Sequence, residues 1–249
     1  MNTKHWIYLL LHFALALIGT IFSQKSNNPI WAGIGSSLIA TGVSGWIIFL
    51  YVFISSRTAE RVALLESSGI RSVFPFRSIL IREQYEERLR KAKEGIDLIG
   101  FGLRALREDY AGDFGKWATQ AQVRILLLDP EFPSSEESLA ILRDREERSR
   151  EGSIRDDVMA FIRVATPLLK QRDGRFKVRL YKAMPNINYF RIDNEAFWGP
   201  YFLGTPSRNT PTFLISRGGN LFPLFAEHFE KLWSDEFSRE IPPDWLAHV

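Results

Sequence analysis

The stretch MPNINYFRID, residues 184 to 193, gathers residue types that bind phosphate. It holds two amides, Asn186 and Asn188, the guanidinium of Arg191 and the carboxylate of Asp193. Amides donate hydrogen bonds, and a planar guanidinium binds two phosphate oxygens at once. The ring of Tyr189 can stack on a base. Together these residue types could bind a phosphate-containing molecule.

Three further features extend this candidate site. Tyr201 offers a second ring, and Arg208 lies in a polar segment, TPSRNTP, that could cover a pocket. The turn from Gly100 to Gly102 follows an apolar run and opens a helical pattern, so its free backbone N–H groups could hold an anion.

Each of these residues also has a plain structural interpretation. Asn186 and Asn188 suit a loop, because asparagine favours turns. Arg191 and Asp193 fall on one face of a strand, where they could form a surface ion pair. A Gly-x-Gly segment is a common tight turn. From the residues alone, both interpretations stay open.

Charge is distributed unevenly along the 249 residues. Residues 1 to 54 contain no Asp or Glu and only Lys4 and Lys25 as cations, so the rest carries 30 Lys and Arg against 29 Asp and Glu, a net charge of +1. This near neutrality gives no indication of a nucleic-acid-coating surface. The absence of cysteine excludes disulfides, thiolate metal sites and a cysteine nucleophile. We expect no metal and no cofactor.

Two uncharged apolar runs near the N-terminus predict a transmembrane hairpin. Residues 6–22 and 30–54 are each long enough to cross a hydrocarbon core of about 30 Å. A cleaved signal peptide is the alternative for the first run, but the second begins only seven residues later. Lys4 precedes the first run, and Arg57 and Arg61 follow the second, which predicts a two-pass membrane protein with both termini in the cytoplasm.

Small residues recur at four-residue spacing in the second run: Gly33, Ser37, Thr41 and Gly45. Such a stripe lets membrane helices approach closely. It could receive the first helix, or it could join two copies of the chain.

The remaining sequence predicts an α/β domain with a parallel or mixed sheet. We expect the hairpin over residues 1–56, a juxtamembrane helix and linker over 57–74, and a cytoplasmic domain over 75–249. Strands are expected at 96–102, 121–130, 175–181, 189–193, 196–201 and 211–217, with helices between them and an amphipathic helix over 221–237. We expect the strand over 189–193 to pair with that over 175–181.

The order of strand, short loop, strand ending in Arg-Ile-Asp, and apolar strand running into Gly199 resembles the signature half of the phospholipase D superfamily. That family reads His-x-Lys-x4-Asp. With its aspartate at Asp193, this chain has Asn188 for the lysine and Asn186 for the histidine. The resemblance implies a mixed-sheet α/β sandwich. Because an amide is neither nucleophilic nor charged, it also implies that the family's covalent phosphodiester chemistry is absent.

The positions of the histidines support this inference. His5 and His12 lie in the apolar N-terminal segment, His228 lies in the last helix, and His248 lies at the C-terminus. None belongs to a His-x-Lys motif.

The chain is also similar, over about residues 75–240, to a group of phospholipase D-like domains that lack the catalytic histidine and look like ligand sensors. The matching residues are Met184-Pro185, Arg191 with Asp193, Pro200-Tyr201, Pro211 with Leu214, and His228-Phe229 with Leu232-Trp233. In outline, the combination with a hairpin resembles two-span effectors of bacterial antiphage defence.

The resemblance implies a receptor or effector in the bacterial inner membrane whose inactive cytoplasmic domain binds a phosphate-containing ligand, such as a cyclic nucleotide, and controls the hairpin in the lipid bilayer. It also implies a homodimer or a higher homo-oligomer. The alternatives are a membrane-tethered phosphodiesterase or nuclease and a ligand-free interaction scaffold.

Overall fold

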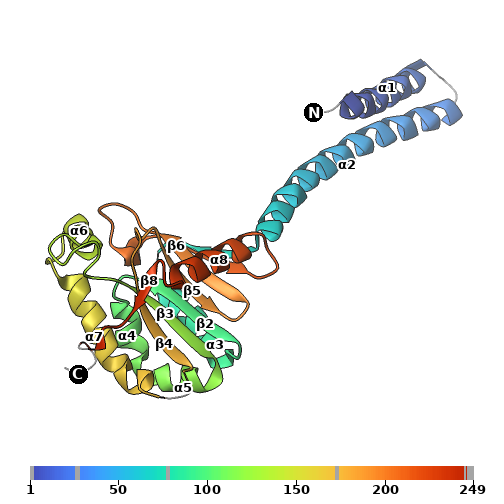
Figure 1. The fold of residues 1–249 in the computed structure, drawn as a ribbon. Helices are drawn as coiled ribbons and strands as arrows, with labels where there is room; N and C mark the ends of the chain where they lie inside the picture. Colours follow the sequence, from blue (N-terminus) through green and yellow to red (C-terminus); the bar gives the residue numbers. More distant parts are fainter. Residues whose placement is uncertain (1–2, 26–28, 77–78, 172–173, 244, 246–249) are drawn as a thin grey trace. The chain divides into compact units, whose positions relative to one another are not determined.

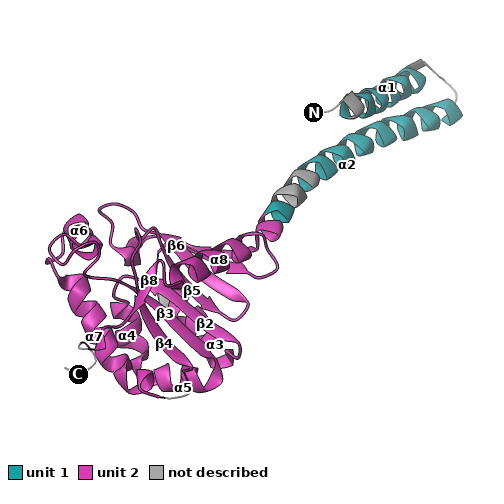
Figure 2. Ribbon diagram, viewed as in Figure 1, with its two compact units in different colours: residues 1–64 teal, residues 65–249 magenta. Residues whose placement is uncertain are grey.

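The computed structural model describes the chain except for residues 1–2, 26–28, 77–78, 172–173, 244 and 246–249. Its residues divide into two compact units, 1–64 and 65–249, which Figure 2 shows in different colours.

Two apolar helices make up the first unit: α1 (Thr3–Lys25) and most of α2 (Pro29–Ser68) (Figure 1). Their segments His5–Gln24 and Pro29–Ser55 have mean hydropathies of 1.9 and 2.0, and only 6% and 11% of them is buried in the protein. A core helix of a soluble protein would bury its apolar side chains. These two helices are therefore long and apolar enough to span a membrane, as the sequence predicts.

Glycines bring the two apolar helices into close contact. A Cβ added at Gly19 would lie 2.6 Å from the carbonyl oxygen of Gly35, and one added at Gly42 would lie 2.7 Å from that of His12. A Cβ at Gly45 would overlap the ring of His12. Close backbone approach of this kind is how helices pack in lipid.

The stripe expected from the sequence contributes only one residue to this contact. Gly45 is buried, whereas Gly33 has nothing within 4 Å of an added Cβ, and Ser37 and Thr41 are exposed. The hydroxyl of Thr41 donates to the carbonyl of Ser37 within α2. α1 is thus received by Gly45 together with two glycines outside the expected stripe, Gly35 and Gly42.

The juxtamembrane helix expected from residue 57 is not a separate element. α2 continues without a break to Ser68 and is followed by Gly69, whose φ of 82° ends it. Residues 70–74, expected as part of a linker, form strand β1 (Ile70–Phe74), which pairs antiparallel with β7 (Thr212–Ser216). A strand at the very edge of a sheet has only one neighbour and is short, so its sequence signal is weak.

The second unit is built on one mixed sheet of eight strands, in the order β1-β7-β6-β5-β2-β3-β4-β8. The central strands β2, β3 and β4 are parallel, and all other pairs are antiparallel. The remaining strands are β2 (Gly95–Gly100), β3 (Gln122–Leu128), β4 (Phe176–Tyr181), β5 (Ile187–Ile192), β6 (Glu195–Pro200) and β8 (Ser238–Glu240).

Helices cover both faces of this sheet, as expected for the α/β class (Figure 1). One face packs against α3 (Ile79–Lys91), α4 (Arg104–Tyr110), α5 (Phe114–Gln120) and α7 (Ser153–Leu169). The other packs against α6 (Leu139–Glu146) and α8 (Leu221–Trp233). α8 buries Phe222, Phe229 and Leu232, which lie on one side of an amphipathic helix.

The expected pairing between residues 175–181 and 189–193 is wrong. β4 pairs with β3 and with the short edge strand β8, whereas β5 pairs with β2 and β6. Strands adjacent in sequence often pair, but here β5 takes the free edge of β2 instead. This placement brings β5 beside the buried central strands, and it determines which side chains meet at the site.

Candidate functional site

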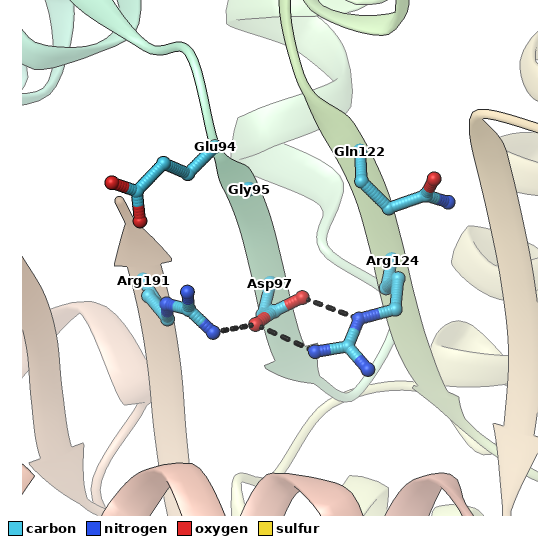
Figure 3. Close-up of a pocket in the computed structure, with 6 residues that line it drawn as sticks. All are labelled: Glu94, Gly95, Asp97, Gln122, Arg124 and Arg191. Atoms are coloured by element: carbon cyan, nitrogen blue, oxygen red, sulfur yellow. Dashed lines mark hydrogen bonds and ion pairs between the residues drawn. The ribbon is translucent and has the colours of Figure 1, made fainter. Parts of the chain in front are cut away.

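A shallow hollow of about 190 Å³ lies over the beginnings of β2 and β3 and beside the end of β5. Its lining comprises Glu94, Gly95, Asp97, Gln122, Arg124 and Arg191 (Figure 3).

Three charged side chains on three adjacent strands form the floor of this hollow. Asp97 of β2 lies directly opposite Arg124 of β3 and directly opposite Arg191 of β5. Figure 3 shows the carboxylate between the two guanidinium groups. Residues opposite each other on neighbouring strands share a face, so the register of the sheet creates this cluster.

Asp97 binds both arginines with short hydrogen bonds. Arg124 donates from Nε to Oδ1 at 2.8 Å and from Nη2 to Oδ2 at 3.0 Å, and Arg191 donates from Nη1 to Oδ2 at 2.8 Å. The side chain of Asp97 is only 3% exposed. A carboxylate this deeply buried needs charge-assisted partners, and two guanidinium groups supply them.

Arg124 also binds a carboxylate on the covering helix. Its Nη1 and Nη2 donate to Glu230 of α8 at 3.0 and 2.7 Å. Its guanidinium lies 4.7 Å from the ring centroid of Phe229 and 5.5 Å from that of Trp233. Burial lowers the pKa of Arg124, but the hydrogen bonds to Asp97 and Glu230 outweigh it, so the pKa is raised and the charge is permanent.

Arg191, predicted as a site residue, lines the hollow. Its Nε donates to the backbone carbonyl of Asp193 at 2.9 Å, and Nη1 is held by Asp97. Among the described residues, no partner accepts a hydrogen bond from Nη2, which lies 3.9 Å from the position of an added Cβ on Gly95. Arg191 therefore has one donor directed at the hollow.

Asp193, the other half of the expected ion pair, binds backbone N–H groups instead of Arg191. Its carboxylate accepts backbone N–H groups of Lys93 at 3.0 Å, Glu94 at 2.8 Å and Gly95 at 3.0 Å. The residue itself turns the chain between β5 and β6 at a φ of 52°, a conformation that Asp tolerates. Asp193 thus fixes the start of β2, and its carboxylate is already fully engaged.

The two asparagines are not part of the hollow. Asn188 is buried, and its Nδ2 donates to the carbonyl of Gly199 at 2.8 Å. On β5 it alternates with Tyr189 and Arg191, so it lies on the opposite face of the sheet. Asn186 is exposed, and its carbonyl accepts the backbone N–H of Tyr201 at 3.0 Å. The structure therefore separates both amides from Arg191.

Neither predicted tyrosine presents a ring to the hollow. Tyr189 is 1% exposed and packs against Phe225 and Phe229 of α8. Burial raises the pKa of its hydroxyl well above the usual range. Tyr201 stacks on Phe101 at 4.1 Å instead of on a ligand.

The glycine turn and Arg208 also lie elsewhere. Gly102 is glycine because α7 packs on it: an added Cβ would lie 2.5 Å from Cβ of Asp157. A neighbouring carboxylate disfavours an anion at this turn. Arg208 is exposed in a short 3-10 helix, Ser207–Asn209, and does not line the hollow. Of the predicted residues, the structure brings only Arg191 to this site.

Asp97, Arg124 and Glu230 were not anticipated from the sequence, although a signal was present. Asp97 and Arg124 are lone charges inside the otherwise apolar runs IDLIG and VRILLL. A charge inside a buried strand needs a partner, so the sequence favours an ion pair or charged cluster at both residues.

The hollow offers two guanidinium groups to an anion, beside the carboxylates of Asp97 and Glu94. Its six lining residues include no histidine, serine, threonine, cysteine or lysine. Across the described residues, no group of three His, Cys, Asp or Glu side chains could hold a metal ion. His228 lies on α8 outside the lining, and His248 lies outside the described residues.

No protein-family model and no curated protein matches the chain. Solved structures with similar folds include TrmBL2, an archaeal chromatin protein, at 18% identity and a TM-score of 0.44, covering 83% of this chain and 71% of that one. They also include phosphatidylserine synthase of Haemophilus influenzae, at 11% identity and 0.44, covering 65% and 37%, and NucT from Helicobacter pylori, at 13% and 0.39, covering 68% and 98%.

Phosphatidylserine synthase and NucT are phospholipase D-like structures. This chain spans little more than a third of phosphatidylserine synthase. With TM-scores below 0.5, these likenesses assign neither activity nor ligand to the chain.

Proposed function

We propose that this chain is a membrane-anchored receptor whose hollow binds a phosphate group of a small molecule, such as a cyclic nucleotide, and thereby controls the two apolar helices. One observation carries the proposal. Two permanently charged arginines, held by one buried carboxylate, line an open hollow that contains an unused guanidinium donor.

The size of the hollow restricts how the ligand binds. Sites that enclose a whole drug-sized ligand occupy roughly 300–1,000 Å³, and this one occupies about 190 Å³. We infer that the phosphate group enters the hollow and that the remainder of the ligand lies outside it, against the surface. Recognition of the phosphate then depends on Arg191 and Arg124.

Binding without turnover fits the residues better than catalysis does. A phosphodiesterase of the resembled family uses a histidine nucleophile, and the lining of the hollow contains no histidine. Asp193, the remaining member of the motif, has its carboxylate occupied by three backbone N–H groups. Turnover of a chromogenic phosphodiester by the purified chain, abolished by Asp193→Asn, would support the enzyme alternative.

The proposal places the chain as a homodimer in the bacterial inner membrane, with residues 65–249 in the cytoplasm. The surface of α2 that carries Gly33, Ser37 and Thr41 is not used by α1 and is exposed within the described part of the chain. It is compatible with contact between copies.

Ligand-induced thermal stabilisation of the purified full chain tests the proposal. We expect inorganic phosphate, cyclic AMP or cyclic di-AMP to raise the melting temperature of the wild type, and Arg191→Gln to abolish the rise. Arg208→Gln is the matched control, because it removes an exposed arginine outside the hollow. No rise with any of these probes would contradict the proposal.

A further inference from the structure

The helix α8 connects the hollow to the end of the membrane helix α2. Both contacts lie within the second unit, which includes the last turn of α2 (Figure 2). Each end of α8 makes one of them. The hollow and the anchor therefore share an element.

At the hollow, Arg124 has two carboxylate partners of very different character. Asp97 is 3% exposed, whereas the side chain of Glu230 is 55% exposed. An exposed ion pair contributes little to stability, because water solvates both charges when the pair opens. Opening the buried pair would instead leave a buried charge without a partner, which is unfavourable. Of the two, Glu230 is the partner that a competing anion can replace.

Glu230 also has the geometry of a phosphate substitute. It presents two oxygens to two nitrogens of one guanidinium, at 3.0 and 2.7 Å, which is how arginine binds two phosphate oxygens. Unless Glu230 is displaced, an anion that binds Arg124 would be repelled by the carboxylate of Glu230 as well as by those of Asp97 and Glu94. Glu94 already pairs with Arg217 at 3.3 Å.

At its other end, α8 is joined to α2. The backbone N–H of Asn220, directly before α8, donates to the carbonyl of Ser67 in the last turn of α2 at 2.9 Å. The backbone N–H of Ser216 donates to the carbonyl of Gly69 at 3.0 Å. Gly69 and Gly219 approach so closely that a Cβ added to Gly69 would lie 2.8 Å from Cα of Gly219.

We propose that Glu230 is an internal competitor that occupies the place of the ligand's phosphate on Arg124, and that its displacement loosens α8 and its junction with α2. The inference rests on the proposed function and deepens it, because it specifies a phosphate group that presents two oxygens to Arg124 as the displacing ligand. In this proposal α8 couples the hollow to α2, and the hydrogen bond from Asn220 to Ser67 is the contact that changes when the ligand binds.

Phosphate binding by Glu230→Gln tests the competition. The probe is inorganic phosphate, titrated by calorimetry into the full chain in detergent micelles. Removing an exposed competitor should lower the Kd for phosphate about fivefold. An exposed ion pair is worth up to about 1 kcal/mol, which corresponds to about a fivefold change in Kd. Glu227→Gln is the matched control. It removes an exposed glutamate of the same helix that pairs with Lys231, and it should leave the affinity unchanged.

Hydrogen exchange at the Asn220 amide tests the coupling. Exchange should accelerate several-fold when phosphate is added to the wild type, and also in Glu230→Gln without phosphate. Glu230→Ala, which leaves no side-chain oxygen, should behave in the same way.

Failure of this inference and failure of the proposed function give different results. If phosphate binds the wild type but Glu230→Gln binds no more tightly, or if the Asn220 amide exchanges at one rate throughout, the inference is overturned and the proposed function stands. If phosphate binds no variant and Arg191→Gln matches the wild type, the proposed function itself is overturned.

Discussion

Asp97 is the single carboxylate that holds both guanidinium groups of the hollow. Removing it in Asp97→Ala would leave Arg124 and Arg191, whose side chains are 20% and 16% exposed, facing each other with only the exposed Glu230 paired to Arg124. Breaking a buried ion pair by removing one partner costs about 3–5 kcal/mol. We expect a loss of this size in urea unfolding of the full chain, followed by circular dichroism.

The control for Asp97→Ala is Glu227→Gln, which breaks an exposed pair on α8. Its cost should be much smaller, because water solvates both charges when the exposed pair opens. Equal losses in the two variants would show that the Asp97 cluster is no more important to stability than a surface pair.

A second residue, His228, makes stability depend on pH. Burial lowers its pKa below the ordinary value of 6.5, and the charge of Lys231 lowers it further. The fold therefore favours neutral His228. The contribution of His228 to stability is fully present above pH 6.5 and is lost as the pH falls through the lowered pKa. We expect His228→Gln to flatten the fall in melting temperature between pH 7.5 and 5.5, and an unchanged pH profile would contradict this.

At the scale of residues, the sequence predicts chemistry better than it predicts proximity. It points to Arg191, an arginine at a strand end beside a polar loop, and Arg191 lines the hollow. Its partner Asp97 lies 94 positions away, and the two meet only because β5 pairs with β2 in one register. Asn188 is one residue from Tyr189, but the alternation of a strand sends them to opposite faces. Such placement follows from sheet topology, which the sequence does not contain locally.

At the scale of elements, glycine positions determine how α1 and α2 pack. Gly42→Leu would place a side chain against the carbonyl of His12, 2.7 Å from the Cβ position, and should force the helices apart. Gly33→Leu is the matched control, because nothing lies within 4 Å of its Cβ position. The change in packing can be measured by disulfide formation between Phe13→Cys and Trp46→Cys, whose native rings stack at 6.2 Å.

The chain contains no natural cysteine, so this cross-link is read without background from the loss of maleimide labelling. We expect a slower cross-link with Gly42→Leu and an unchanged one with Gly33→Leu. Equal rates in the two variants would mean that Gly42 does not bring the helices together.

Most elements can be predicted from periodicity, and the misses have a common cause. Long apolar runs identify both apolar helices and the buried strands β2 and β3. The edge strands β1 and β8 each have a single neighbour and lack the continuous apolar run of the central strands, so the sequence does not predict them. The pairing of β4 with β8 was also missed, because it joins segments more than 55 residues apart.

At the scale of the whole molecule, one continuous helix connects two units of different composition. α2 belongs to the apolar unit over most of its length and to the α/β unit in its last turn. A receptor needs such a connection, because a ligand can alter the membrane segment only through an element that both units share. The junction of Ser67 and Gly69 with the chain around Asn220 and Ser216 is where a change in α8 would reach that element.

The proposed function depends on the orientation of the chain in the membrane. Lys4, Arg57 and Arg61 flank the two apolar runs on one side, so we expect the α/β unit in the cytoplasm and the turn between the helices outside. A single cysteine can report each side. In intact cells a membrane-impermeant maleimide should label Gln24→Cys, and Asn209→Cys only after lysis. Both positions are exposed, so burial cannot protect either. Labelling of Asn209→Cys in intact cells would place the hollow outside the cell and rule out a cytoplasmic nucleotide as its ligand.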